Sequence, residues 1–207
     1  MTRTTARLTQ LAAALVAGTL TLTACGDDAD AGHSSMGSSD TAASAGSSAE
    51  ADVGDADVTF AAGMIPHHQS AIEMAQLAEG RAADPRVLDL AARIEAAQGP
   101  EIEILSGWLE QWGADDEASM DQGSMDHGSG GMMSEQDMQA LTNATGAEFD
   151  RLFLTQMIAH HTGAVEMAQA ELSEGRNTDA LAMAESIRDG QSDEIAEMEQ
   201  LLAELGG

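Results

Sequence analysis

An internal repeat limits what this chain can fold into more than any other feature of its sequence. Residues 60–113 correspond to residues 153–206 at an offset of 93, apart from a two-residue shift that ends by Ile94 and Ile187. Over the first 18 positions of the repeat, ten residues are identical. Each copy has the pattern of a helix, a turn and a second helix. Two copies are too few for a solenoid, so we expect two helical hairpins that pack together as a four-helix bundle.

Capping residues and the spacing of apolar residues place the individual helices. Asp55 or Asp57 is the expected N-cap of the first helix. Proline lacks an amide hydrogen, so Pro66 should bend the first helix, and Gly99-Pro100 should interrupt and kink the second. The helices are expected over about residues 55–79, 85–112, 147–174 and 179–205, with a short helix over 134–143.

The composition agrees with an all-α protein and excludes several classes of partner. Aromatic residues make up only 2% of the chain, whereas β-sandwiches and barrels usually contain many aromatic and β-branched residues. The chain has 36 acidic and 8 basic residues, and its formal net charge is -28. Nucleic acids and anionic membrane surfaces bind clustered Lys and Arg, so neither is an expected partner of this domain.

The N-terminus has the pattern of an export signal. Residues 1–24 contain two Arg followed by an apolar stretch that is too short for a membrane span, as in a signal peptide. The sequence Leu22-Thr23-Ala24-Cys25 resembles the bacterial lipobox, in which the chain is cut before the Cys and a lipid is attached to its sulfur. We therefore expect an exported protein anchored to the cell membrane through Cys25, with its domain on the extracytoplasmic side. The alternative is an ordinary signal peptide with an incidental Cys.

Composition divides the rest of the chain. Gly, Ser, Ala and Asp dominate residues 25–54, which should form a flexible tether because they contain almost no large apolar side chain. The first helical hairpin spans 55–113, and a Met- and His-containing linker spans 114–133. The short helix and the second hairpin occupy 134–207, and residues 55–207 together should form one bundle domain.

The first helix of each copy carries His and Met on one face of a helical wheel. Imidazole nitrogen and thioether sulfur are ligands of borderline and soft metals, and a lipidated Cys25 would leave no free thiol. Such a set favours copper, and Cu(I) over Cu(II), because thioethers carry no charge. The alternative is that Met fills the core and His forms internal hydrogen bonds. The residues concerned are Met64, His67, His68, Met74, Met157, His160, His161 and Met167.

Two further sets of residues are candidates for supporting roles. Gln98 and Gln191 lie within apolar stripes, where they could hydrogen-bond the His rings and fix their tautomers, or bond one helix to another. The Met and His residues of the linker could form an accessory site for a soft cation, although the segment could also be an ordinary acidic linker. These linker residues are Met120, Met125, His127, Met132 and Met133.

The repeated motif resembles that of a known family. Met-Ile-x-His-His-x-x-Ala-(Ile/Val)-Glu-Met-Ala occurs at 64–75 and 157–168 and is similar to the signature of the bacterial "domain of unknown function 305" family. The resemblance covers about residues 55–207. It implies a ferritin-like helical bundle in an exported protein, and some members of the family are implicated in periplasmic copper binding and copper tolerance. The eight His and Met residues of the two helical faces match the family motif, whereas Gly99-Pro100 departs from its pattern.

Three functions are compatible with these patterns. The leading hypothesis is a lipid-anchored copper-binding protein, not an enzyme, that buffers copper or passes it to an envelope copper-handling protein. A ferritin-like di-metal oxidoreductase is an alternative, but such sites use Glu-x-x-His, and Met64 and Met157 stand where the Glu would be. The third is an interaction module without metal, docking through Trp108 and Trp112. The oligomeric state is left open.

Overall fold

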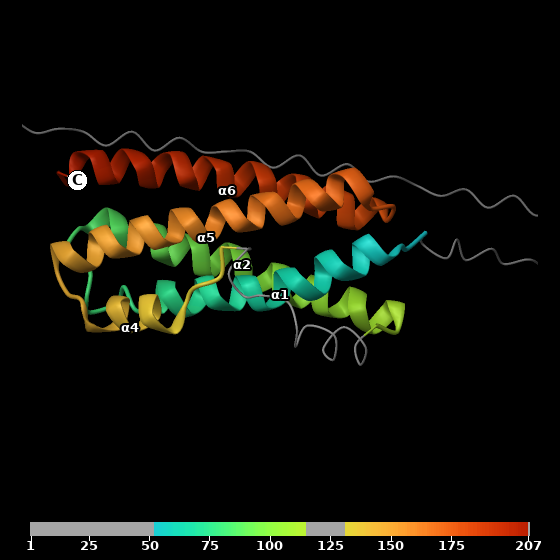
Figure 1. Cartoon of the computed structure of the whole chain (residues 1–207), viewed down its shortest axis with the longest axis horizontal. Coiled ribbons are helices and arrows are strands. Elements are labelled where there is room, and N and C mark those ends of the chain that lie inside the picture. The colour runs from blue at the N-terminus through green and yellow to red at the C-terminus, as the bar shows by residue number, and fades with distance from the viewer. Residues whose placement is uncertain (1–51, 115–130, 207) are drawn as a thin grey trace, which may run out of the picture. The chain divides into compact units, whose positions relative to one another are not determined.

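The computed structural model describes residues 52–114 and 131–206. Every regular element within these two segments is a helix, so the expectation of an all-α fold is confirmed. The expected signal peptide, Cys25 and most of the expected tether lie outside the described residues. The helices are α1 (Asp55–Gln76), α2 (Pro85–Trp112), α4 (Glu135–Asn143), α5 (Ala147–Glu174) and α6 (Thr178–Glu204) (Figure 1).

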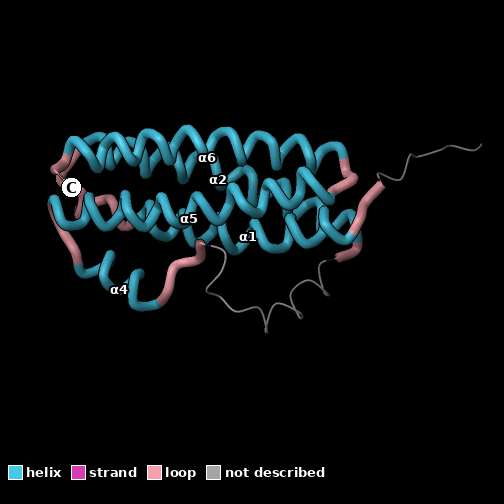
Figure 2. The backbone as a smooth tube through the Cα atoms, turned by 45° about the horizontal axis from the view of Figure 1, so that its top comes forward, coloured by secondary structure: helices cyan, strands magenta, loops and turns pink. Residues whose placement is uncertain are grey.

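Two antiparallel hairpins build the bundle (Figure 2). α1 packs against α2, α5 packs against α6, and the hairpins meet mainly through α1 and α5, which run in opposite directions (Figure 1). The short helix α4 lies beside α5, outside the four long helices. The bundle therefore has the architecture that the repeat predicts, with one hairpin from each copy.

Most helix boundaries agree with the prediction. The two differences are the end of α1 and the continuity of the helices at their prolines. α1 ends at Gln76 because the amides of Leu77 and Ala78 donate to carbonyls only three residues earlier, which tightens the chain into a turn. Both helices continue without a break across their prolines, so the expected interruption at Gly99-Pro100 is absent. Each proline removes one amide donor, and the helix continues on both sides of it.

Asp57 connects the beginning of α1 to the other hairpin. Its buried carboxylate accepts hydrogen bonds from the amides of Arg176 and Asn177, at 3.0 and 2.8 Å, in the turn between α5 and α6. It also accepts from the amide of Gly54 at 2.6 Å. Gly54 is the N-cap of α1, so the expectation of Asp55 or Asp57 as the cap was wrong: Asp57 lies inside the helix and faces the other hairpin.

Asp150 makes the reciprocal contact from α5. It is the repeat counterpart of Asp57, it is equally buried, and it accepts hydrogen bonds from the amides of Ala83 and Asp84, both at 3.0 Å, in the turn between α1 and α2. Each hairpin therefore satisfies backbone donors in the turn of the other hairpin. The two turns lie at opposite ends of the bundle, so the hairpins are joined at both ends (Figure 1).

Glu171 breaks the symmetry of these contacts. Its side chain is 2% exposed and interacts with Asp57, whereas the corresponding residue of the first copy is Ala78. Burial, reinforced by the hydrogen bond to the Asp57 carboxylate and by its charge, raises the pKa of Glu171 to about 8. The Glu171 carboxyl is therefore mostly protonated at neutral pH, beside the Asp57 carboxylate.

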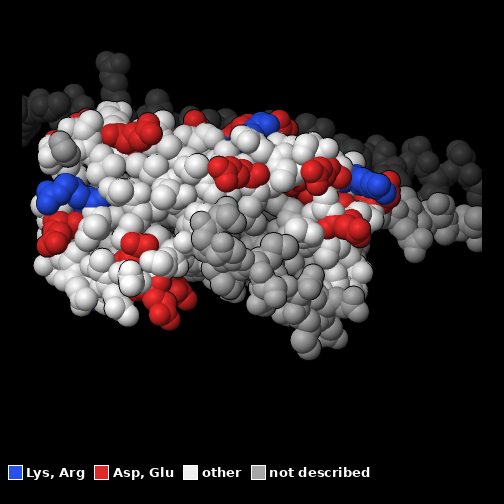
Figure 3. All heavy atoms as spheres, viewed as in Figure 1, with Lys and Arg blue, Asp and Glu red and all other residues white. Residues whose placement is uncertain are grey.

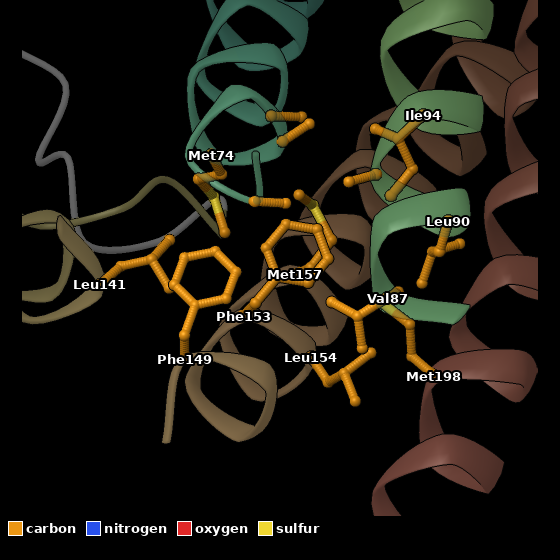
Figure 4. Packing of buried hydrophobic residues seen from close by; sticks show 14 of the residues in the cluster. Met74, Val87, Leu90, Ile94, Leu141, Phe149, Phe153, Leu154, Met157 and Met198 are labelled. Carbon is orange, nitrogen blue, oxygen red and sulfur yellow. The ribbon is translucent and has the colours of Figure 1, made fainter. Parts of the chain in front are cut away.

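The apolar core consists of two separate clusters. In the first, Phe153 and Met157 of α5 lie close to Met74 of α1 (Figure 4), and the rings of Phe149 and Phe153 stack with centroids 5.8 Å apart. The second cluster is built from the opposite ends of the same four helices. Its buried members are Phe60, Ala61, Met64, Leu105, Leu109, Ala164, Ala168, Ala184 and Ile187.

Replacing Asp150 with Ala should destabilise the protein, because the amides of Ala83 and Asp84 would lose their acceptor. An unsatisfied buried donor costs about 1–3 kcal/mol, so we expect the free energy of unfolding in urea to fall by about 2–5 kcal/mol. Asp193→Ala, at an exposed position of α6, is the control and should change that free energy by less than about 0.5 kcal/mol. Equal stability of the two variants would contradict the reciprocal contact.

Glu171→Gln should stabilise the protein progressively as the pH rises. The pKa of Glu171 is raised from 4.5 to about 8 on folding, so the folded chain binds the proton more tightly and wild-type stability declines between these pH values. Gln stays neutral, so the difference in Tm between the variant and the wild type should grow up to about pH 8 and then level off. Thermal denaturation measures this difference. The exposed Glu174→Gln is the control, and a pH-independent difference for Glu171→Gln would refute the assignment.

Candidate metal centre

A layer of polar side chains crosses the bundle between the two apolar clusters. On each long helix the inward-facing positions, which recur every three or four residues, change from apolar to polar at this level and then become apolar again. We call this set the polar layer. It consists of His67 and His68 of α1, Gln98 and Glu101 of α2, His160 and His161 of α5, and Gln191 and Glu194 of α6.

The His pairs of the two repeats form one cluster. The rings of His67 and His160 are in contact, with centroids 3.8 Å apart and planes inclined by 45°. The ring centroids of His160 and His161 are 6.4 Å apart. All four His side chains are at most 2% exposed. The antiparallel packing of α1 against α5 therefore brings together residues that are far apart in the sequence.

His160 is held as a neutral imidazole. Burial, and then the positive charges that His67, His161 and His68 would carry, lower the pKa of His160 to about 2. Neither of its ring nitrogens makes a well-formed hydrogen bond to a side chain of the described residues. A neutral imidazole with an unshared nitrogen lone pair is the form of His that binds metals.

Two carboxylates orient the imidazoles of His68 and His161. His68 Nε2 lies 2.7 Å from Glu101 Oε2, and His161 Nε2 lies 2.7 Å from Glu194 Oε2. A carboxylate accepts, so each Nε2 carries the hydrogen, and in the neutral ring the lone pair is on Nδ1. Both Nδ1 atoms are buried and have no hydrogen-bond partner among the described residues. The two repeats thus present the same imidazole tautomer to the polar layer.

The structure gives Gln98 no hydrogen bond to the His rings. Gln98 and Gln191 are buried in the polar layer, but within the described part of the chain the Gln98 amide makes no hydrogen bond and neither does Oε1 of Gln191. Glu101 and Glu194, one helical turn further on, bind the His rings instead. Glu101 and Glu194 occupy matching positions in the two copies, which was the only hint of this role in the sequence. Periodicity alone does not show which residues of different helices pair. All four residues line a cavity of about 70 Å³ between α2 and α6.

The candidate Met ligands fall into two groups. Met64 and Met157 are fully buried and lie one helical turn before the His pairs, at the edges of the two apolar clusters. Met74 and Met167 lie six residues after His68 and His161, about 9 Å further along each helix. Met74 packs in the first apolar cluster, whereas Met167 is half-buried and lines a pocket of about 290 Å³ beside Glu171. Of these four residues, Met64 and Met157 are therefore the nearest to the His pairs along their own helices.

The accessory linker residues are only partly visible. Met120, Met125 and His127 lie outside the described residues. Met132 and Met133 precede α4 and line a groove on the outside of the bundle. Among the described residues, no three His, Cys, Asp or Glu side chains are arranged to hold a metal ion.

The surface surrounding this site is strongly acidic. Carboxylates are spread over the face of the bundle seen in Figure 3, with few Arg among them. Such a surface raises the local concentration of cations without selecting among them. Several Arg are also neutralised locally: Arg86 pairs with Asp84 and Glu204, Arg93 with Asp89 and Glu197, and Arg188 with Glu185 and Asp189.

The sequence of residues 57–202 matches the model of a family described as "Domain of unknown function (DUF305)". The chain belongs to the DUF305 family. A DUF305 protein from Streptomyces coelicolor has a crystal structure with a TM-score of 0.68 at 31% identity, covering 73% of this chain and 93% of that one. CopM in its Cu(II)-bound form has a TM-score of 0.62 at 35% identity, covering 72% and 96%. CopM in its Cu(I)-bound form has a TM-score of 0.59 at 32% identity, covering 73% and 98%.

These matches confirm the family and the helical bundle implied by the repeated His-His motif. Both copies of the DUF305 motif, at 64–75 and 157–168, lie within the matched residues and supply the His pairs of the polar layer. No curated protein matches the chain. None of the helices in residues 52–114 and 131–206 is long and apolar enough to cross a membrane.

Changing Glu101 to Ala should release the His68 ring from its single tautomer. The buried Nε2–H would lose its acceptor, which should lower the free energy of unfolding by about 1–3 kcal/mol and let the Nδ1–H tautomer become populated. Long-range ¹H–¹⁵N NMR correlations of the imidazoles report the tautomer directly. Glu103→Ala, an exposed change on the same helix, should leave the His68 signals unchanged. A wild-type His68 already in the Nδ1–H form would contradict the assignment.

Proposed function

We propose that this chain is an exported, lipid-anchored protein that binds copper, and that His67, His68, His160 and His161 hold Cu(I) in the polar layer. The contact between His67 and His160 carries the proposal, because it joins the His pairs of both repeats in one buried cluster. Copper is the cargo of such a protein, which would buffer it or pass it to another envelope protein. We assign it no catalysed reaction, and the lipid would be attached to Cys25.

The protonation of the imidazoles supports metal binding. The carboxylates of Glu101 and Glu194 fix His68 and His161 with their Nδ1 lone pairs unused, and proteins commonly orient metal-binding His in this way. The pKa of His160 is lowered to about 2, so a metal ion does not have to displace a proton from this ring at neutral pH. The nitrogen donors of His68, His160 and His161 are therefore available before the ion arrives.

Charge and ligand softness favour Cu(I) over Cu(II). The side chains nearest along the helices to the His pairs on α1 and α5 include the thioethers of Met64 and Met157, which are soft and uncharged. Burying a monovalent ion costs less hydration free energy than burying a divalent one. Glu101 and Glu194 carry negative charge at the edge of the layer and would balance the charge of the ion. We propose that Gln98 and Gln191 surround the ion without binding it, and that Met74 and Met167 serve mainly in packing.

The relatives support copper as the metal. CopM has been crystallised with Cu(I) and with Cu(II), at 32% and 35% identity to this chain, and also with Ag. Silver is a soft ion that resembles Cu(I) in its ligand preference. The alternatives gain no comparable support. A ferritin-type di-metal site uses Glu-x-x-His, and Met64 and Met157 stand where those Glu would be. Trp108 and Trp112 stack on each other half-buried, with centroids 5.7 Å apart.

Anaerobic titration with Cu(I) against a chromophoric chelator tests the proposal. Two double variants remove the same number of imidazoles: His67→Ala with His160→Ala from the polar layer, and His33→Ala with His127→Ala from outside the described residues. We expect tight binding by the wild type and by the second variant, and loss of tight binding in the first. Circular dichroism and a milder pair, His68→Gln with His161→Gln, separate loss of ligands from loss of folding.

The same titration can contradict the proposal in two ways. If binding survives in the folded polar-layer variants and disappears with His33 and His127, the metal is bound by other parts of the chain. If the wild type does not compete with the chelator at all, the His cluster is a structural feature of the bundle and copper is not its ligand.

A further inference from the structure

Three thioethers that the polar layer does not use gather in a groove on the outside of the bundle. The groove has a volume of about 500 Å³ and lies between the outer face of α1 and the chain that leads into α4. Pro66, Gln69 and Glu73 form the α1 side. Met132, Met133 and Met138 form the other side, and we call this feature the methionine groove.

Gly131 fixes the chain that carries these methionines against α5. Its φ of +74° is a conformation that glycine adopts readily and that other residues rarely adopt. A Cβ atom at this position would lie 2.7 Å from the carbonyl oxygen of Ala159 and 2.9 Å from that of His160. It would also lie 3.0 Å from Cα of Gly163, so two glycines permit the close approach. The backbone before Met132 thus touches the turn of α5 that bears the His pair.

The methionine groove therefore lies beside the seam between α1 and α5, at the level of the polar layer. Next to the groove, Gly131 lies against the backbone of His160 on α5. On its α1 side, the groove is lined by Pro66, the residue directly before His67. His67 and His160 are the two residues whose rings meet on the inner side of this seam. An α-helix with its side chains is about 10 Å across, so the groove and the His cluster are separated by about the thickness of one helix.

The side chains of the groove suit a soft cation better than they suit packing alone. Met132 is 37% exposed, whereas Met133 and Met138 are half-buried against the first apolar cluster. Leu or Ile would cover the cluster equally well, but only the thioether adds a soft donor atom. Glu73 contributes a negative charge at the rim. Met138 was not among the candidates from the sequence, although it lies only five residues after Met133.

We propose that Met132, Met133 and Met138 form a surface site for a soft monovalent cation, and that this site loads the His cluster across the seam between α1 and α5. The loading step rests on the function proposed above, whereas the surface site does not. Thioethers are uncharged and exchange soft ions readily, so such a site would bind more weakly than the buried imidazoles and would release the ion inward.

Titration of the full chain, labelled with ¹³C at the Met methyl groups, with Ag(I) tests the surface site. We expect the methyl resonances of Met132, Met133 and Met138 to shift together, in a binding phase weaker than that of the His cluster. The variant Met132→Leu, Met133→Leu and Met138→Leu should lose that phase while keeping its fold, because these substitutions nearly conserve volume. Met120→Leu, Met125→Leu and His127→Asn together form the matched control, which should retain the phase.

A second measurement tests the loading step and separates it from the proposed function. Anaerobic transfer of Cu(I) from a chelator should be slower in the groove variant, with no change in the final affinity of the His cluster. Shifts confined to other Met residues, or loss of the weak phase in the control variant, would overturn the groove site. Equal transfer rates would overturn the loading step. If the groove methyls shift while the His ring ¹⁵N signals do not, the groove site stands and the buried copper site falls.

Discussion

Four imidazole rings buried at the middle of the bundle determine how the remaining side chains are arranged. Imidazole cannot replace an apolar side chain without hydrogen-bond partners or a ligand, because its nitrogens lose water on burial. The apolar core is therefore interrupted, and two separate clusters lie on either side of the polar layer. Glu101 and Glu194 accept from two of the rings, while His160 remains neutral. Polar groups occupy the centre of the bundle, and hydrogen bonds to Asp57 and Asp150 join the two hairpins at its ends.

The repeat was sufficient to predict the hairpins, the bundle and the inward position of both His pairs. Each of these follows from local periodicity and from the offset between the copies. The partners of the His rings were not predictable in this way. Glu101 and Glu194 lie 33 residues from His68 and His161, and periodicity places a residue on a face without naming what it meets. Asp57 was wrongly predicted as an N-cap for a similar reason. An acidic residue near the start of a helix suggests a cap, and the sequence does not show that another hairpin lies next to it.

The two copies have diverged in ways that the shared fold makes visible. Met74 and Met167 occupy matching positions, yet one is in the core and the other lines a surface pocket. That pocket adjoins Glu171, which has an Ala counterpart in the first copy. Pro66, which lines the methionine groove, has Ala159 as its counterpart in the second copy. The bundle therefore combines a symmetric interior with an exterior that differs between its halves.

The reciprocal carboxylate contacts also bear on how the chain folds. Asp57 bonds to amides 119 and 120 residues away, and Asp150 to amides 66 and 67 residues away, so these contacts form only after long loops have closed. Neither hairpin contains the acceptor for its own turn, and neither is complete as an independent folding unit. A cut between the hairpins would place the acceptor and the donors of each reciprocal contact on different fragments, so each fragment would depend on the other for the bonds at its own turn.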